Sequence, residues 1–207
     1  MNHYPIDKTN PLVLASISPR RKAILKQIGI PFEATGSMVD ETLYEGMQPA
    51  DIACQMAIRK AESVQHVRKN RWILGADTIV VMNTRVFGKP KDSHDCRDML
   101  LRLRGRNHRV ITGFCILDPE GKSVHFESVA TKVKVKEISE IEIEDYIKTG
   151  EPFGKAGGYA IQGIGSFMIE HINGSYTNVV GLPVCEVVGA LVRCGALRGF
   201  PSIDVTF

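Results

Sequence analysis

Residues 72–82 form the segment that most restricts the fold, with the sequence Trp-Ile-Leu-Gly-Ala-Asp-Thr-Ile-Val-Val-Met. A nearly continuous apolar run of this length is typical of a β-strand covered on both faces, whereas a half-exposed strand alternates. The chain must therefore pack other elements on both sides of a sheet. The carboxylate inside this run, Asp77, needs a partner or a function, because a buried ionised carboxylate is costly when it is unpaired.

The surrounding pattern predicts helices and further strands. Apolar residues recur at helical spacing over 49–70, a second helix is expected over 93–103, and a third starts at a capping box over 139–142. Residues 108–117 resemble the buried strand, whereas 129–136 alternate strictly and place Lys132, Lys134 and Lys136 on a solvated face. This irregular mixture predicts an α/β (mixed α+β) fold around a central mixed sheet.

The length and composition favour one domain. A chain of 207 residues with 43% apolar content can bury a full core, so we expect a single domain over 1–207, with 198–207 as a candidate tail. The glycine-rich segment 150–165 is the nearest feature to a boundary. A glycine pair at Gly157 and Gly158 permits positive φ, which serves a ligand cradle or a plain turn.

Charge and cysteine content exclude several classes of function. A net charge of +3, with evenly spread basic residues, argues against a nucleic-acid partner or a membrane surface. We find no apolar run of the roughly 20 residues that a membrane span needs. The five cysteines form no C-x-x-C pair and are odd in number, which predicts reduced thiols and a cytoplasmic location.

A strand, loop and helix are predicted over residues 12–28, and their junction favours an anion. Ser18 stands where a helix N-cap is expected and Pro19 at the first helical position, so backbone N–H groups converge beside Arg20 and Arg21. Phosphate binds readily at such a helix end. For this segment alone, a capped helix with solvated arginines is the better interpretation.

Several motifs occur in one order along the chain and together resemble the Maf family of nucleoside triphosphate pyrophosphatases. The resemblance spans about residues 12–191 and rests on these segments: Ser16-x-Ser18-Pro19-Arg20-Arg21, Gly75-Ala76-Asp77-Thr78, Gly88-Lys89-Pro90, Leu103-x-Gly105-x-x-His108-x-Val110-x-Thr112-Gly113, Lys155-Ala156-Gly157-Gly158-Tyr159-x-Ile161-Gln162-Gly163 and Val180-Gly181-Leu182-Pro183. It implies a two-lobed fold similar to the inosine triphosphate pyrophosphatases, with a nucleotide cleft and a homodimeric assembly. The implied reaction cleaves a nucleoside triphosphate to the monophosphate and pyrophosphate with a divalent cation, Mg²⁺ or Mn²⁺.

The resemblance also implies roles for individual residues. Asp77 is the expected proton acceptor and metal ligand, and Lys60 and Lys89 reach the phosphates, although a lysine in isolation is more often a surface cation. Ser16, Arg20 and Arg21 bind substrate, and Glu41 is the second metal ligand, with Asp40 as its competitor. A buried Asp77 capping a neighbouring loop is the alternative. His108 is expected to be fixed by a hydrogen bond outside the active site.

Three positions bear on the nucleobase. Family members acting on dTTP and UTP carry Arg, Thr and Gln where this chain has Arg20, Thr78 and Gln162, whereas a 7-methyl-GTP branch is expected to carry Trp, Gln and Glu. A glutamine amide offers both a donor and an acceptor, which matches thymine or uracil but also other bases. We therefore expect dTTP, UTP and 5-modified pyrimidine triphosphates as substrates. A septum-formation regulator that acts by binding, or a 7-methyl-GTP pyrophosphatase, is the alternative.

Overall fold

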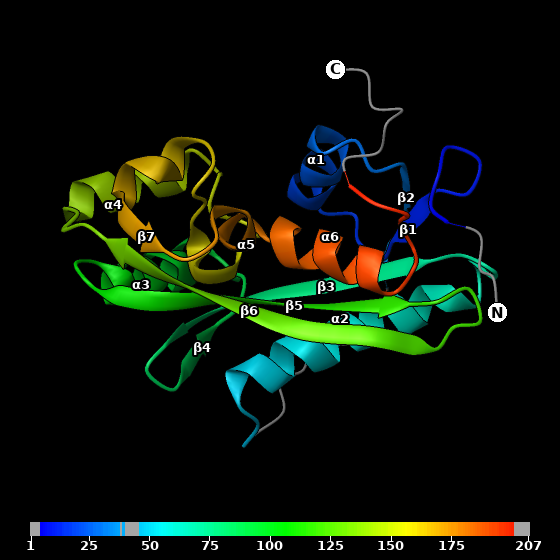
Figure 1. Ribbon diagram of the computed structural model, residues 1–207. Helices are drawn as coiled ribbons and strands as arrows, with labels where there is room; N and C mark the ends of the chain where they lie inside the picture. The colour runs from blue at the N-terminus through cyan, green and yellow to red at the C-terminus, as the bar shows by residue number, and fades with distance from the viewer. Residues whose placement is uncertain (1–4, 38, 40–45, 201–207) are drawn as a thin grey trace. The chain divides into compact units, whose positions relative to one another are not determined.

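The computed structural model describes residues 5–37, 39 and 46–200 (Figure 1). Within this part of the chain, seven strands form one sheet in the order β2-β1-β3-β5-β6-β7, and β4 pairs with β3. Strand β1 is parallel to β2 and β3, whereas β4 is antiparallel to β3 and β7 is antiparallel to β6. The predicted mixed α/β fold with a central mixed sheet is confirmed.

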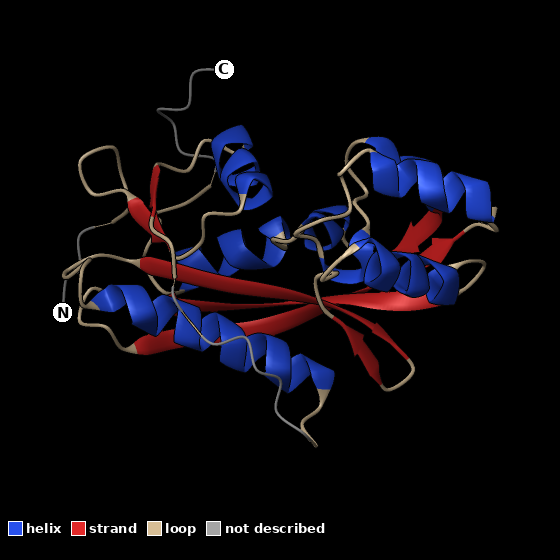
Figure 2. Cartoon of the chain, turned by 180° about the vertical axis from the view of Figure 1, so that it is seen from behind, coloured by secondary structure: helices blue, strands red, loops and turns tan. Residues whose placement is uncertain are grey.

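The strands are β1 (Leu12–Leu14), β2 (Phe32–Ala34), β3 (Ile73–Met82), β4 (Arg85–Phe87), β5 (Asn107–Leu117), β6 (Ser123–Val135) and β7 (Ile169–Asn173). The α-helices are α1 (Pro19–Gln27), α2 (Pro49–Gln65), α3 (Ser93–Leu103), α4 (Glu140–Lys148), α5 (Tyr176–Val180) and α6 (Val184–Arg193). Two short 3₁₀ helices are η1 (Ala156–Gly158) and η2 (Ile164–Met168). Figure 2 shows the helices and strands from behind, each type in its own colour.

The chain divides into two compact units. The first unit comprises Met1–Asp77, Thr112–Ser128 and Gly181–Phe207, and the second comprises Thr78–Ile111 and Val129–Val180. Strands β3, β5 and β6 contribute residues to both units. The glycine-rich segment 150–165 lies wholly inside the second unit, so it marks no boundary between units. One domain with two lobes stays a prediction.

The first unit packs α2 and α6 on opposite faces of its strands (Figures 1 and 2). Helix α2 buries the apolar face that its spacing predicted and ends at Gln65, earlier than the expected residue 70. Strand β3 is buried along most of its length, and its interior half-buried positions are Asp77 and Thr78. One cluster of the core joins α2 to the strands: Val13, Ala15, Ala57, Ala61, Val64, Ile73, Cys115 and Leu117.

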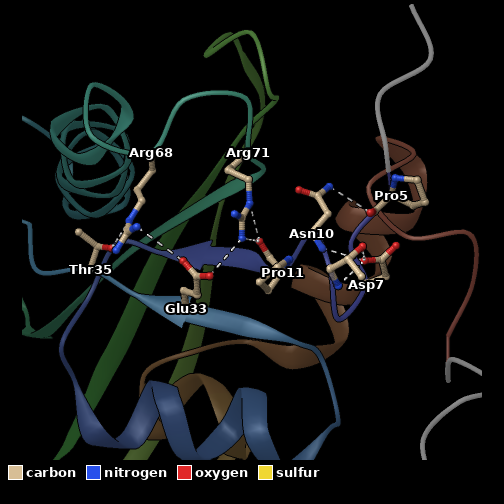
Figure 3. Close-up of polar contacts among 9 residues, drawn as sticks. Pro5, Asp7, Asn10, Pro11, Glu33, Thr35, Arg68 and Arg71 are labelled. Atoms are coloured by element: carbon tan, nitrogen blue, oxygen red, sulfur yellow. Dashed lines mark hydrogen bonds and ion pairs between the residues drawn. The ribbon is translucent and has the colours of Figure 1, made fainter.

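A polar network fixes the edge strand β2 in the first unit (Figure 3). Two arginines that follow α2 flank Glu33, with N···O distances of 3.7 Å from Arg68 and 3.6 Å from Arg71. Arg68 also donates to the Thr35 hydroxyl at 3.1 Å, and Arg71 donates to the Pro11 carbonyl at 2.7 Å. These contacts hold the strand from which the chain continues toward residues 40–45. The predicted metal ligand at position 41, and its competitor at 40, lie outside the described residues.

The second unit encloses its own core. Helix α3 packs against α4, and Arg97 of α3 forms ion pairs with Glu140 and Glu144 of α4. Buried apolar side chains of α3, α4 and the strands form a cluster that includes Cys96, Leu100, Val110, Val133, Ile143, Tyr146 and Tyr159. The predicted capping box is confirmed, because Glu142 N–H donates to Ser139 Oγ at 3.2 Å and Ser139 N–H donates to Glu142 Oε2 at 2.6 Å.

The lysine face of β6 differs from the prediction. The strand begins at Ser123 instead of residue 129. Lys132 is exposed, but Lys134 donates to the Gly105 carbonyl at 2.6 Å and Lys136 contacts Glu142 at 3.2 Å. The solvated-face interpretation was therefore wrong for Lys134, because the turn at Gly105 lies within reach of its ammonium group. Lys136 keeps 39% of its side chain exposed and forms a surface ion pair.

All five cysteines carry free thiols, as predicted: Cys54, Cys96, Cys115, Cys185 and Cys194. Burial raises the pKa of the Cys96 and Cys115 thiols to about 11, which keeps both protonated and unreactive at neutral pH.

Among the described residues, the helices are too short or too polar for any of them to cross a bilayer.

Candidate functional site

The loop between β1 and α1 is built around the hydroxyl of Ser16. Ser18 occupies the N-cap and Pro19 the first helical position, as predicted, but the Ser18 side chain makes no capping hydrogen bond. Instead, Ser16 Oγ accepts from Ser18 N–H at 3.2 Å and from Arg21 Nη1 at 3.2 Å. The first turn of α1 contains no acidic residue, so the helix dipole and the arginines give this end a positive potential.

Arg21 links this loop to a distant motif. Its side chain is buried, and Nε donates to the Gly181 carbonyl at 2.8 Å while Nη1 contacts Ser16. The guanidinium therefore ties the start of α1 to the segment 180–183, a contact that the sequence did not reveal. This contact makes Arg21 a structural link, and its role in binding substrate stays a prediction. Arg20 is half-exposed in the same turn.

An ion pair joins α2 to β3 at the predicted catalytic position. Lys60 Nζ donates to Asp77 Oδ1 at 2.6 Å, and the exposed fractions of the two side chains are 10% and 15%. This charge-assisted hydrogen bond offsets the free-energy cost of burying a carboxylate in an apolar strand. Lys60 is thus a partner of Asp77 in addition to being a candidate phosphate ligand.

The approach of α2 to β3 depends on Gly75. A Cβ atom at this position would lie 2.1 Å from the Ala57 carbonyl oxygen and 2.9 Å from the Ala61 Cβ. Only glycine allows the helix backbone to come so close to the strand. The Gly-Ala-Asp-Thr motif therefore has two roles. Gly75 allows α2 to pack closely on β3, and Asp77 accepts a hydrogen bond from Lys60 of α2.

The second unit contains the other predicted site residues. Thr78 is half-buried on β3, Lys89 is exposed after β4, and Gln162 is exposed just before η2. The Gly88 carbonyl accepts from Gly157 N–H at 2.9 Å, so the Gly-Lys-Pro segment meets the glycine-rich motif. Gly157 and Gly158 have φ angles of 73° and 69°, as the glycine pair predicted.

Within each unit, the predicted residues form separate groups. The first unit joins Ser16 to Arg21 and Lys60 to Asp77, and the second unit brings together the segments that carry Lys89 and Gln162. Among residues 5–37, 39 and 46–200, no cluster of three or more His, Cys, Asp or Glu side chains is arranged to hold a metal ion. Of the two predicted metal ligands, Asp77 lies among these residues and position 41 lies outside them.

His108 is held inside the second unit, as expected. Its Nε2 lies 2.6 Å from the Tyr159 hydroxyl, and only 2% of the residue is exposed. Burial lowers the pKa of His108 to about 4, so the ring is neutral at pH 7. A neutral buried ring contacts the glycine-rich motif at Tyr159 and is poorly suited to transfer protons.

Taken together, these features define a mixed α/β protein with a cationic helix start and a shielded lysine–aspartate pair, a combination suited to phosphate esters and anhydrides. The family described as Maf-like protein matches residues 11–194. This chain therefore belongs to the Maf-like family.

Curated relatives match over nearly the whole chain. A protein from Syntrophotalea carbinolica named dTTP/UTP pyrophosphatase is 48% identical over 97% of this chain and 92% of its own length. A second protein of that name, from Geotalea uraniireducens, is 49% identical over 90% of this chain and 96% of its own length. Among solved structures, a nucleoside-triphosphatase / dITP/XTP pyrophosphatase from Mycobacterium abscessus is 17% identical and covers 90% of this chain and 96% of its own, with a TM-score of 0.40.

Proposed function

We propose that this protein hydrolyses dTTP and UTP to the nucleoside monophosphate and pyrophosphate. Membership of the Maf-like family and the names of relatives at 47–49% identity support this activity. The observation that carries the proposal is the 2.6 Å pair between Lys60 and Asp77. It sets a shielded carboxylate beside a cation in a family whose relatives are named pyrophosphatases.

In the proposed reaction, water attacks the α-phosphorus, and the bond from that phosphorus to the oxygen bridging it to the β-phosphorus breaks. Asp77 accepts the proton of the attacking water, and pyrophosphate leaves with the bridging oxygen. The hydrogen bond from Lys60 orients the carboxylate, so that the base needs little reorganisation during the reaction. Asp77 lies on a strand, which limits its movement further.

Cationic groups balance the charge of the triphosphate, which is about −4 at neutral pH. Arg20 and the first turn of α1 offer a guanidinium and backbone N–H groups to phosphate oxygens, and Ser16 holds that loop in shape. In the second unit, Lys89 supplies a further ammonium group. Arg20 and Lys89 lie at exposed or half-exposed positions, where a phosphate can reach them.

A divalent cation, Mg²⁺ or Mn²⁺, fits the donors that the structure offers. Such a cation is often bound through one or two carboxylates together with the substrate phosphates, so a single protein carboxylate suffices in the described residues. Asp77 is that carboxylate, and we assign the second to Glu41. When bound, the cation would neutralise charge that develops on the phosphate oxygens.

The base is assigned to Thr78 and Gln162, and Arg20 is the third position of the dTTP/UTP pattern. The exposed Gln162 amide offers a donor and an acceptor to the edge of thymine or uracil. We assign the protein to the cytoplasm and expect it to work as a homodimer. Free thiols at all five cysteines support a reducing compartment.

The activity is tested by presenting dTTP, UTP, CTP and 7-methyl-GTP to the purified protein with Mg²⁺ or Mn²⁺. Release of pyrophosphate from dTTP and UTP is the expected result. Orthophosphate as the main product would indicate cleavage of a different bond. A preference for 7-methyl-GTP would assign the protein to that branch, and no turnover at all would favour a regulator that acts by binding.

The role of Asp77 is tested with Asp77→Asn, which keeps the shape of the side chain but removes its basicity. We expect kcat for dTTP to fall about 100-fold or more while nucleotide affinity changes little. Asp118→Asn is a matched control, because Asp118 is a buried aspartate of the first unit that caps the turn to Lys122. Retained turnover in Asp77→Asn would contradict the mechanism.

A further inference from the structure

Tyr146 reaches from α4 to the loop that carries Gln162. Its ring is 2% exposed, and its hydroxyl donates to Glu151 Oε2 at 2.8 Å. The same hydroxyl accepts from Ala160 N–H at 3.2 Å. Burial, together with the neighbouring Glu151 carboxylate, raises the pKa of Tyr146 above its ordinary value, so the hydroxyl keeps its proton and continues to donate. One end of the loop is thus fixed at Ala160.

Glu151 holds the other end of the loop. Its Oε1 accepts from Ile164 N–H at 2.9 Å, and its Oε2 accepts from Gly165 N–H at 2.7 Å as well as from Tyr146. Burial raises the pKa of Glu151, but these hydrogen bonds outweigh it and hold the pKa below its ordinary value. The carboxylate is therefore ionised at neutral pH and accepts three hydrogen bonds, which are stronger for a charged acceptor.

The loop is shaped to receive this carboxylate. Gly163 has a φ angle of 87°, and a Cβ atom there would lie 2.2 Å from Glu151 Oε1. Any other residue at this position would both strain the backbone and displace the carboxylate. Gln162 lies between the two fixed points, Ala160 and Ile164, and is itself exposed. Its position is therefore set by the anchors on either side of it, and not by packing of its own side chain.

We propose that Tyr146 and Glu151 are positioning residues for nucleobase selection: they fix the backbone on both sides of Gln162, so that its amide meets a pyrimidine edge in one orientation. This inference rests on the proposed function, in which Gln162 contacts the base. Neither residue needs to touch the nucleotide. An exposed glutamine on an untethered loop would pair with many bases, whereas a fixed amide discriminates among them.

The test uses Glu151→Gln and Tyr146→Phe in the full-length protein, with dTTP and CTP as substrates. Glutamine has a single acceptor oxygen, so at least one loop N–H loses its partner, and phenylalanine removes both bonds of the hydroxyl. We expect KM for dTTP to rise about tenfold, kcat to stay within about twofold, and the preference for dTTP over CTP to fall about tenfold. Hydrogen exchange should accelerate at the Ile164 or Gly165 amide in Glu151→Gln, and at the Ala160 amide in Tyr146→Phe.

The matched control is Ser139→Ala, which removes the cap of the same helix, α4, and leaves the Tyr146 and Glu151 contacts in place. It should lower Tm without changing KM or selectivity. Unchanged KM and selectivity in the folded Glu151→Gln protein would overturn the inference, and this variant alone decides if Tyr146→Phe does not fold. A wild-type protein that releases no pyrophosphate from dTTP or UTP would overturn the proposed function instead, and the exchange measurement would then report on the anchoring alone.

Discussion

The ion pair of the first unit and the Gln162 loop of the second unit are held in different ways. Lys60 and Asp77 lie on a helix and a strand, whose backbones are fixed by their own hydrogen bonds and by the close packing at Gly75. Gln162 lies on an irregular segment that is fixed by side chains from outside it, Tyr146 and Glu151. The groups assigned to chemistry thus sit on rigid elements, whereas the group assigned to selection sits on a tethered loop.

The two units also differ in how they bury polar groups. The first unit buries a charged pair, in which each partner compensates the other. The second unit buries a neutral pair, His108 and Tyr159, in which burial suppresses the charge of the ring. Removing either Lys60 or Asp77 leaves the other charge without this partner. The stability of the His108–Tyr159 pair depends on pH, because protonation of His108 would place a charge in a buried site. Each arrangement can therefore be disturbed separately.

The largest effect is expected from Gly75→Ala. The added methyl group would collide with the backbone of α2 at 2.1 Å, so the helix must move away from β3. We expect the free energy of unfolding to fall by about 3 kcal/mol, with loss of the Lys60–Asp77 contact and of activity. Denaturant titration measures the change, and Gly199→Ala, where no atom lies within 4 Å, is the control. A stable and active Gly75→Ala protein would show that the close packing is not required.

The second effect concerns acid stability of the second unit. The pKa of His108 is lowered from 6.5 to about 4 in the folded protein by burial, so between these pH values the unfolded chain binds the proton more tightly. The stabilisation is therefore complete above pH 6.5 and lost as the pH falls toward 4, by about 3 kcal/mol.

Urea unfolding of the wild type and of His108→Gln between pH 7 and pH 4 measures this contribution. Glutamine can still bond to the Tyr159 hydroxyl but does not titrate, so its stability should fall less steeply with acid. His66→Gln, at an exposed site outside the second unit, should follow the wild type. Equal pH slopes for all three proteins would show that His108 does not control acid stability.

The smallest of the three effects is expected from Lys60→Met, which keeps the aliphatic stem and leaves the Asp77 carboxylate without its 2.6 Å partner. We expect a loss of about 2 kcal/mol in stability and at least about tenfold in kcat. In a double-mutant cycle with Asp77→Asn, the combined loss of stability should be smaller than the sum of the two single losses. The exposed Lys69→Met is the control, and additive losses would argue against a coupled pair.

Periodicity and capping predicted most of the regular elements. The buried strand, the helix over 93–103 and the capping box at Ser139 were read correctly because these signals are local. Helix α6 was missed although its pattern is local. The contact from Lys134 to the Gly105 carbonyl was missed because it joins positions 29 residues apart. The sequence held one clue to the contacts of Glu151, the glycine at position 163. A side chain at this position would collide with the Glu151 carboxylate.

The sequence by itself determined the element types, the mixed sheet and the motifs that place this chain in the Maf-like family. These features can be read from short stretches of sequence, because hydrophobic periodicity, helix caps and motifs each depend on neighbouring residues. The tertiary structure alone decided the partner of each buried polar group: Lys60 for Asp77, Gly181 for Arg21, and Glu151 for the loop around Gln162. Such partners lie far apart in sequence, and only the packing of α2 on β3, or of α4 against its loop, brings their atoms within hydrogen-bond distance.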